Sequence, residues 1–135
     1  MALPKYYRFV IENKTGVTIA IGEIDLLINR SRTGPTDAGI VYEGSAVALT
    51  NAGAISNNTF GVIGAVQDNG TDKWRDGAGH FKSNIAAATP SGDVVLYMQE
   101  STDNTNWPDD DRASHIVSVM NITAASTDEQ TDFVF

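Results

Sequence analysis

The chain has 135 residues, no cysteine and a formal net charge of −8. One domain of this length can bury a full core, and the absence of cysteine excludes disulfide bonds and cysteine-bound metals. The acidic balance argues against a nucleic-acid partner, which usually requires a basic face. No apolar run reaches the roughly 18 residues of a membrane-spanning helix, and the first residues do not follow the signal-peptide pattern.

Strong helix formers are sparse, whereas β-branched and turn residues are common, and this composition favours strands. Alternating apolar residues predict strands over residues 5–13, 17–22 and 24–31. A turn over residues 13–16 should join the first two strands into a hairpin. The residues expected on one face are Tyr7, Phe9 and Ile11 in the first strand, Val17, Ile19 and Ile21 in the second, and Ile24, Leu26 and Ile28 in the third.

The middle of the chain is richer in turn residues. Residues 31–39 predict a loop and residues 40–42 an edge strand. Residues 46–49 fit a short strand or one helical turn, and we favour the strand. A weak strand is expected around Val62. The most polar stretch is 67–79, in which Asn69-Gly70 and Asp76-Gly77 are both typical of turns. The next strand is expected over residues 80–88.

A strand that begins at Asp93 has apolar residues on both faces, which indicates a central position in a sheet. Val94, Leu96 and Met98 should share one face, and Val95, Tyr97 and Gln99 the other. A polar turn over residues 101–106 follows, and then Trp107 and Pro108. Two more strands are expected over residues 115–122 and 130–135.

This series of short strands and turns predicts an all-β fold. We expect a single β-sandwich or jelly roll of about eight to ten short strands. The domain should cover residues 1–135, with residues 1–4 as a short N-terminal arm. No motif repeats at a fixed period, which argues against a propeller.

The central strand and its turn also carry a resemblance. The segment resembles a strand of small structural proteins of tailed-bacteriophage virions. The matching residues are Val95, Leu96, Tyr97, Gln99, Ser101, Thr102, Asp103, Trp107 and Pro108. The turn is also similar to the Asp-box hairpin of sialidases, but it is one residue shorter and occurs once, which argues against a sialidase propeller.

The phage resemblance implies a function without catalysis. It suggests a viral capsid decoration or cement protein, made in the host cytoplasm and located in the virion, that binds the major capsid protein or another virion protein. It also implies a homo-oligomer, with a trimer favoured. A tail or neck subunit remains open as an alternative. We expect no nucleic-acid partner, no membrane association and no cofactor.

One acidic loop has the oxygen ligands that calcium prefers. Asp103, Asp109, Asp110 and Asp111 are its carboxylates, and Ca²⁺ takes about six to eight oxygens. However, an EF-hand loop needs glycine at its sixth position and glutamate at its twelfth, and the sequence counted from Asp103 has neither. His80 and His115 lie in different expected strands and should not share a metal. We therefore expect no metal site.

Two tryptophans lie beside polar turns and are candidates for contact with a partner. Trp74 and Trp107, together with Leu3 and Pro4 of the expected arm, form the candidate partner-binding set. The two rings could also form a sugar-stacking platform, so a carbohydrate- or receptor-binding module is the alternative function. An enzyme is disfavoured, since neither a nucleophile elbow nor a phosphate-binding loop is present.

Overall fold

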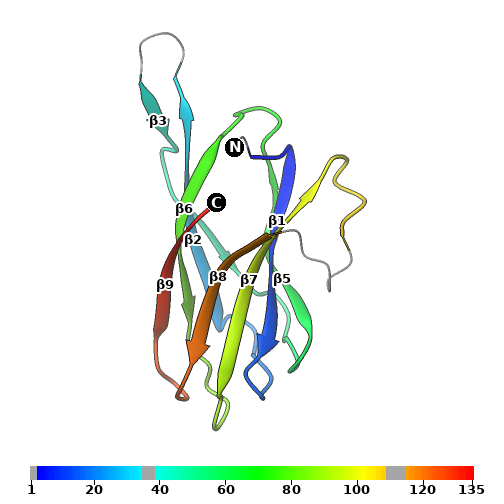
Figure 1. The fold of residues 1–135 in the computed structure, drawn as a ribbon, viewed down its shortest axis with the longest axis vertical. Helices are drawn as coiled ribbons and strands as arrows, with labels where there is room; N and C mark the ends of the chain where they lie inside the picture. The colour runs from blue at the N-terminus through cyan, green and yellow to red at the C-terminus, as the bar shows by residue number, and fades with distance from the viewer. Residues whose placement is uncertain (1–2, 35–38, 109–114) are drawn as a thin grey trace.

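The computed structural model describes residues 3–34, 39–108 and 115–135, and this part of the chain forms nine strands and no helix. Two antiparallel sheets pack face to face as a β-sandwich (Figure 1), as the sequence predicts. Nothing in the described ranges could therefore cross a membrane as a helix. The strands are β1 (Tyr6–Lys14), β2 (Ile24–Thr33), β3 (Ile40–Tyr42), β4 (Val47–Thr50), β5 (Phe60–Asp68), β6 (Asp76–Ser83), β7 (Gly92–Ser101), β8 (His115–Ile122) and β9 (Glu129–Val134).

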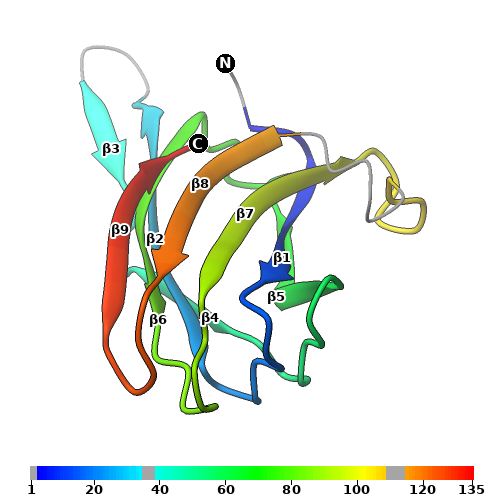
Figure 2. The same ribbon diagram turned by 60° about the horizontal axis from the view of Figure 1, so that its bottom comes forward.

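The strand order defines two sheets, which we call sheet I and sheet II. Sheet I has the order β5-β1-β7-β8, and sheet II has the order β3-β2-β6-β9 with β4 paired to β2. Figure 2 shows β8 and β9 side by side where the two sheets meet on one side of the sandwich. On the other side an isolated bridge joins Asn51 to Ile63, which links the end of β4 to β5.

The core lies between the sheets and contains the residues that the alternation assigns to it. β7 pairs with both β1 and β8, so its central position is confirmed. Val94, Leu96 and Met98 all face the core and are at most 5% exposed. Burial of each such side chain stabilises the fold by roughly 1.5–3 kcal/mol. The expected inward faces of the first and third strands are confirmed too, at Tyr7, Phe9, Ile11, Ile24, Leu26 and Ile28.

The predicted hairpin between residues 5–13 and 17–22 is wrong. β1 pairs with β5 and β7 instead, and residues 17–22 contribute only one bridge, between Ile19 and Ile55. The side chain of Asn13 explains the difference, since its amide nitrogen donates to the carbonyls of Val17 and Ile55, each at 2.8 Å. These bonds turn the chain away from the sheet. Ile19 still reaches the core, whereas Ile21 is 68% exposed.

The strand expected over residues 80–88 is shifted, because β6 begins at Asp76 and ends at Ser83. The dipeptide Asp76-Gly77 is therefore part of a strand and not a turn. Glycine is needed at position 79 for space, and at position 77 it leaves room for the ring of Phe135. A Cβ at Gly77 would lie 2.1 Å from Cζ of Phe135, and one at Gly79 would lie 2.6 Å from the carbonyl oxygen of Leu27. These glycines let neighbouring strands and rings approach closely.

Candidate binding surface

Asp103 organises the loop that follows β7. Its Oδ1 accepts hydrogen bonds from the backbone nitrogens of Thr105 and Asn106, both at 2.9 Å, and from Oγ of Ser101. Its Oδ2 accepts from Nδ2 of Asn106 at 2.7 Å. These bonds stabilise the charged carboxylate, so the pKa of Asp103 lies well below its usual range. Both oxygens therefore accept hydrogen bonds that hold the turn.

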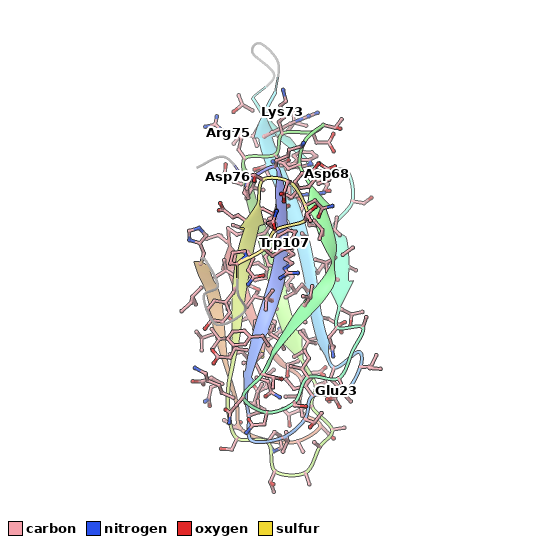
Figure 3. All side chains as sticks on the ribbon, turned by 90° about the vertical axis from the view of Figure 1, so that its right-hand side faces the viewer. Glu23, Asp68, Lys73, Arg75, Asp76 and Trp107 are labelled. Carbon is pink, nitrogen blue, oxygen red and sulfur yellow. The ribbon has the colours of Figure 1, made fainter. Side chains whose placement is uncertain are left out.

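The same loop, residues 101–108, places Trp107 against the outer face of sheet I. We call it the Trp107 loop. Cζ of Arg8 lies 4.5 Å from the centroid of the Trp107 ring, close enough for a cation–π interaction. Arg8 also donates from Nε to Oε1 of Gln99 at 2.8 Å, which connects β1 to β7. Figure 3 shows Trp107 in front of β1, where its ring is half-buried. The loop therefore covers one end of this sheet.

Beside the loop, the outer face of sheet I is apolar. We call this surface the sheet I face, and define it as Phe60, Val62, Tyr97, Ile116 and Val119. Strand pairing connects three of its members, because Val62 lies opposite Val10, Val10 opposite Tyr97, and Tyr97 opposite Ile116. The centroid of the Phe60 ring lies 6.1 Å from that of the Tyr97 ring. Val62, Ile116 and Val119 are 39%, 63% and 52% exposed. Adjoining apolar side chains on three or more strands make a patch, which is typical of an interaction surface.

A shift in the β7–β8 register creates part of this face. Leu96 pairs with Ser118 and Tyr97 pairs with Ile116, so Val117 is an extra residue. Val117 packs against the core instead. Residues 116 and 119 would normally lie on opposite faces of a strand, but the bulge lets both point outward. The alternation in residues 115–122 does not predict this face, although the apolar residues on both sides of the central strand are a signal for it.

A polar group borders the sheet I face at Glu12. The hydroxyl of Tyr97 donates to Oε2 of Glu12 at 2.9 Å, and Lys14 Nζ lies 3.2 Å from the same oxygen. Burial and the neighbouring carboxylate together raise the pKa of Tyr97 to about 12. Tyr97 is therefore neutral at ordinary pH and presents its ring to solvent with a fixed orientation.

Trp74 has a different environment from Trp107. It is only 7% exposed, and the guanidinium groups of Arg30 and Arg32 lie 5.7 and 5.0 Å from its ring centroid. Asn69 fixes the turn before it, accepting from the Trp74 backbone nitrogen at 2.6 Å and donating to its carbonyl at 2.9 Å. Its ring is therefore inside the fold, and the two tryptophans do not form an exposed platform.

The expected arm is also more tightly held than the sequence indicates. Leu3 belongs to the core and is 9% exposed, and its carbonyl accepts from Nδ2 of Asn69. Leu3, a candidate for contact with a partner, is therefore held in the core of its own chain. Pro4 is half-buried beside Ser101, Thr102 and Asn106 of the Trp107 loop. Of the candidate set, Trp107 and Pro4 stay at the surface.

The two histidines lie in different strands, as expected, and these strands belong to different sheets. His80 on β6 contacts the carboxylate of Asp132, and Nε2 of His115 on β8 lies 3.3 Å from Glu100. Within the described ranges, no group of three or more histidine and carboxylate side chains could hold a metal ion. Asp109, Asp110 and Asp111, which complete the candidate calcium loop, lie outside the described residues.

Comparisons with known proteins add no family to this geometry. No protein-family model matches the chain, and neither a curated protein nor a solved structure matches it.

Proposed function

We propose that this chain is a non-enzymatic structural protein of a bacteriophage particle, a capsid decoration or cement protein. It binds an assembled protein lattice through the sheet I face and the adjoining Trp107 loop. The phage assignment comes from the resemblance of the central strand and its turn. The observation that supports binding is the sheet I face, where Ile116 and Val119 are 63% and 52% exposed.

The chemistry of this face fits a protein partner. Aliphatic side chains provide buried area on contact, and Tyr97 and Trp107 add aromatic rings of the kind that dominate protein interfaces. The Asp103 turn and the Arg8 contact hold Trp107 in place. A preorganised ring loses little conformational freedom on binding. Several copies on one lattice would also bind more tightly than each contact alone.

Co-sedimentation with purified capsids tests this proposal. The wild-type chain should pellet with undecorated capsids, and Ile116→Ser combined with Val119→Ser should weaken binding by about 2 kcal/mol or roughly thirtyfold. Ile21→Ser is the matched control, because Ile21 is 68% exposed in a loop outside both sheets. This control should bind like wild type, and all variants should first show wild-type melting curves.

Other outcomes identify the alternatives. Binding to purified tails but not to capsids would indicate a tail or neck subunit. Binding to a glycan array without binding to any virion part would overturn the proposal in favour of a carbohydrate-binding module. Equal capsid binding by the Ile116/Val119 variant and wild type would show that the sheet I face is not the contact surface.

A further inference from the structure

The outer face of sheet II is a second exposed surface, which the proposed function does not use. Two adjoining shallow pockets, of about 540 and 570 Å³, lie on it and share Leu27 and His80. Leu27 is 44% exposed and Val134 is 76% exposed. Three alanines, Ala46, Ala48 and Ala78, also line the pockets, together with polar side chains that include Asp25, Asn29, Lys82 and Asp132. This face therefore combines exposed apolar, small and charged side chains.

Strand pairing fixes the positions of its side chains. On β2 and β6, Asp25 lies directly opposite Lys82, and Leu27 lies opposite His80. These pairs extend into rows of side chains across the sheet. Leu27 is also paired with Ala48 on β4, and His80 is also paired with Asp132 on β9. Each row thus has the order β4, β2, β6, β9.

We propose that a second copy of this chain docks on this face, with a two-fold axis parallel to the strands and midway between β2 and β6. Such an axis places β2 of one copy over β6 of the other, and β4 over β9. Aligned packing of two sheets is a common geometry in β proteins. The interface is isologous, so each contact occurs twice.

The charges on this face are self-complementary under that axis. Asp25 of each copy meets Lys82 of the other, which forms two equivalent ion pairs. Asp25 makes no ion pair with any described residue of its own chain, whereas Lys82 Nζ lies 3.2 Å from Asp128. The second copy therefore supplies a cation to a carboxylate that lacks one. Complementary charges of this kind fix register and exclude other arrangements.

The shapes are complementary as well. The axis brings the exposed Val134 of one copy over Ala46 of the other, and Asp132 over Ala48. Similarly, Asn29 of one copy lies over Ala78 of the other, because these two positions are paired across β2 and β6 within each chain. Three larger side chains, Val134, Asp132 and Asn29, then each face an alanine, which is the large-against-small arrangement that fills space between packed layers. In contrast, Leu27 of one copy faces His80 of the other.

The other in-plane two-fold axis, perpendicular to the strands through the Leu27 row, is disfavoured. It would place Asp132 against Asp132 and His80 against His80. Like charges that face each other directly are destabilising. The charge pattern therefore favours a dimer with β2 over β6. Such a dimer leaves the sheet I face, proposed to bind the lattice, on the opposite side of each copy.

Charge exchange between two variants tests the geometry. Wild-type protein should sediment at twice the 14.4 kDa of one chain. Asp25→Lys and Lys82→Asp should each weaken self-association at least about tenfold, because each creates two like-charge contacts across the axis. An equimolar mixture of these two variants should dimerise again, since both contacts in the mixed dimer are opposite in charge.

Mixing the two variants distinguishes loss of the proposed dimer contact from an effect on folding alone. Asp25 and Lys82 are also neighbours within one sheet, and a second chain cannot repair that contact. Ile116→Ser, on sheet I, is the control and should dimerise like wild type even if it no longer binds capsids. A wild type that remains monomeric up to about 1 mM, a trimer mass, or no recovery on mixing would each overturn the proposed dimer.

Discussion

The guanidinium of Arg8 stacks on the ring of Trp107, with Cζ 4.5 Å from the ring centroid. This contact ties the end of the Trp107 loop to the outer face of sheet I. It joins two residues that are far apart in the sequence, and only the pairing of β1 with β7 brings them together. The loop is consequently positioned by the sheet and not by its own turn alone.

Replacing Trp107 with alanine should lower the free energy of unfolding by about 0.5–2 kcal/mol, the range of a cation–π contact. Urea denaturation of the variant and wild type measures this difference. Trp107→Phe keeps a ring over Arg8 and should retain part of the stabilisation. If the alanine variant is as stable as wild type, the stack does not hold the loop.

The Asp103 turn should respond to acid in a defined direction. Because the pKa of Asp103 is lowered in the folded state, its stabilising effect is present above its ordinary value of 3.8 and is lost as the pH falls through the folded pKa. The backbone amide resonances of Thr105 and Asn106 should therefore stay constant from neutral pH to about 4 and shift only under more acidic conditions. Asp103→Asn keeps an acceptor oxygen without the charge, so this shift should disappear.

Leu96 at the centre of β7 should be among the most sensitive core positions. It is 0% exposed, so Leu96→Ala removes buried methyl groups and leaves a cavity, at a cost of about 2–5 kcal/mol. Val119→Ala is the control on the neighbouring strand, because Val119 is 52% exposed. Its effect should stay within about 0.5 kcal/mol. Denaturant melts in which both variants lose similar stability would contradict the observed register.

The alternation of apolar residues was sufficient to predict the strands whose faces differ in burial. β1 and β2 follow this pattern, whereas β7 was predicted from apolar residues on both of its faces, and the inward residues of all three strands are those expected. The segment 17–22 has the same alternation but forms no strand, because bonds from the Asn13 side chain replace the ladder. A pattern within a segment does not reveal a hydrogen bond to a distant carbonyl such as that of Ile55.

The candidate surface was harder to predict than the core. Trp74 and Trp107 look alike in sequence, since both follow polar turns. Trp74 is buried because Asn69 turns the chain inward and two arginines cover its ring. Ile116 and Val119 are exposed together only because of the bulge at Val117. Both features depend on pairing between strands, which local composition does not encode.

Gly79→Ala should destabilise the fold although the substitution is small. The new methyl group would lie 2.6 Å from the carbonyl oxygen of Leu27, so β2 and β6 would have to separate. Overpacking of this kind costs about 1–3 kcal/mol. Gly44→Ala is the matched control, because nothing lies within 4 Å of its added methyl group. Equal melting temperatures for the two variants would show that β2 and β6 are not held closely at Gly79.

Glu43→Gln should be more destabilising than its small change in shape suggests. Arg30 is only 8% exposed, and it donates to Glu43 from both Nε and Nη2 and to the Tyr7 hydroxyl from Nη1 at 3.1 Å. These bonds raise the pKa of Arg30 against the opposing effect of burial, so the guanidinium stays charged. Removing the carboxylate leaves a buried cation without its counter-ion, which costs about 3–5 kcal/mol.

A matched control separates this effect from the loss of any one negative charge. Glu129→Gln removes a carboxylate that accepts a hydrogen bond only from the Thr123 hydroxyl, at 3.3 Å, among the described residues. Its free energy of unfolding should stay within about 0.5 kcal/mol of wild type. Because the chain carries −8 overall, both variants relieve the same general repulsion. A Glu43→Gln loss no larger than that of the control would show that Arg30 finds other partners or water at this end of the sandwich.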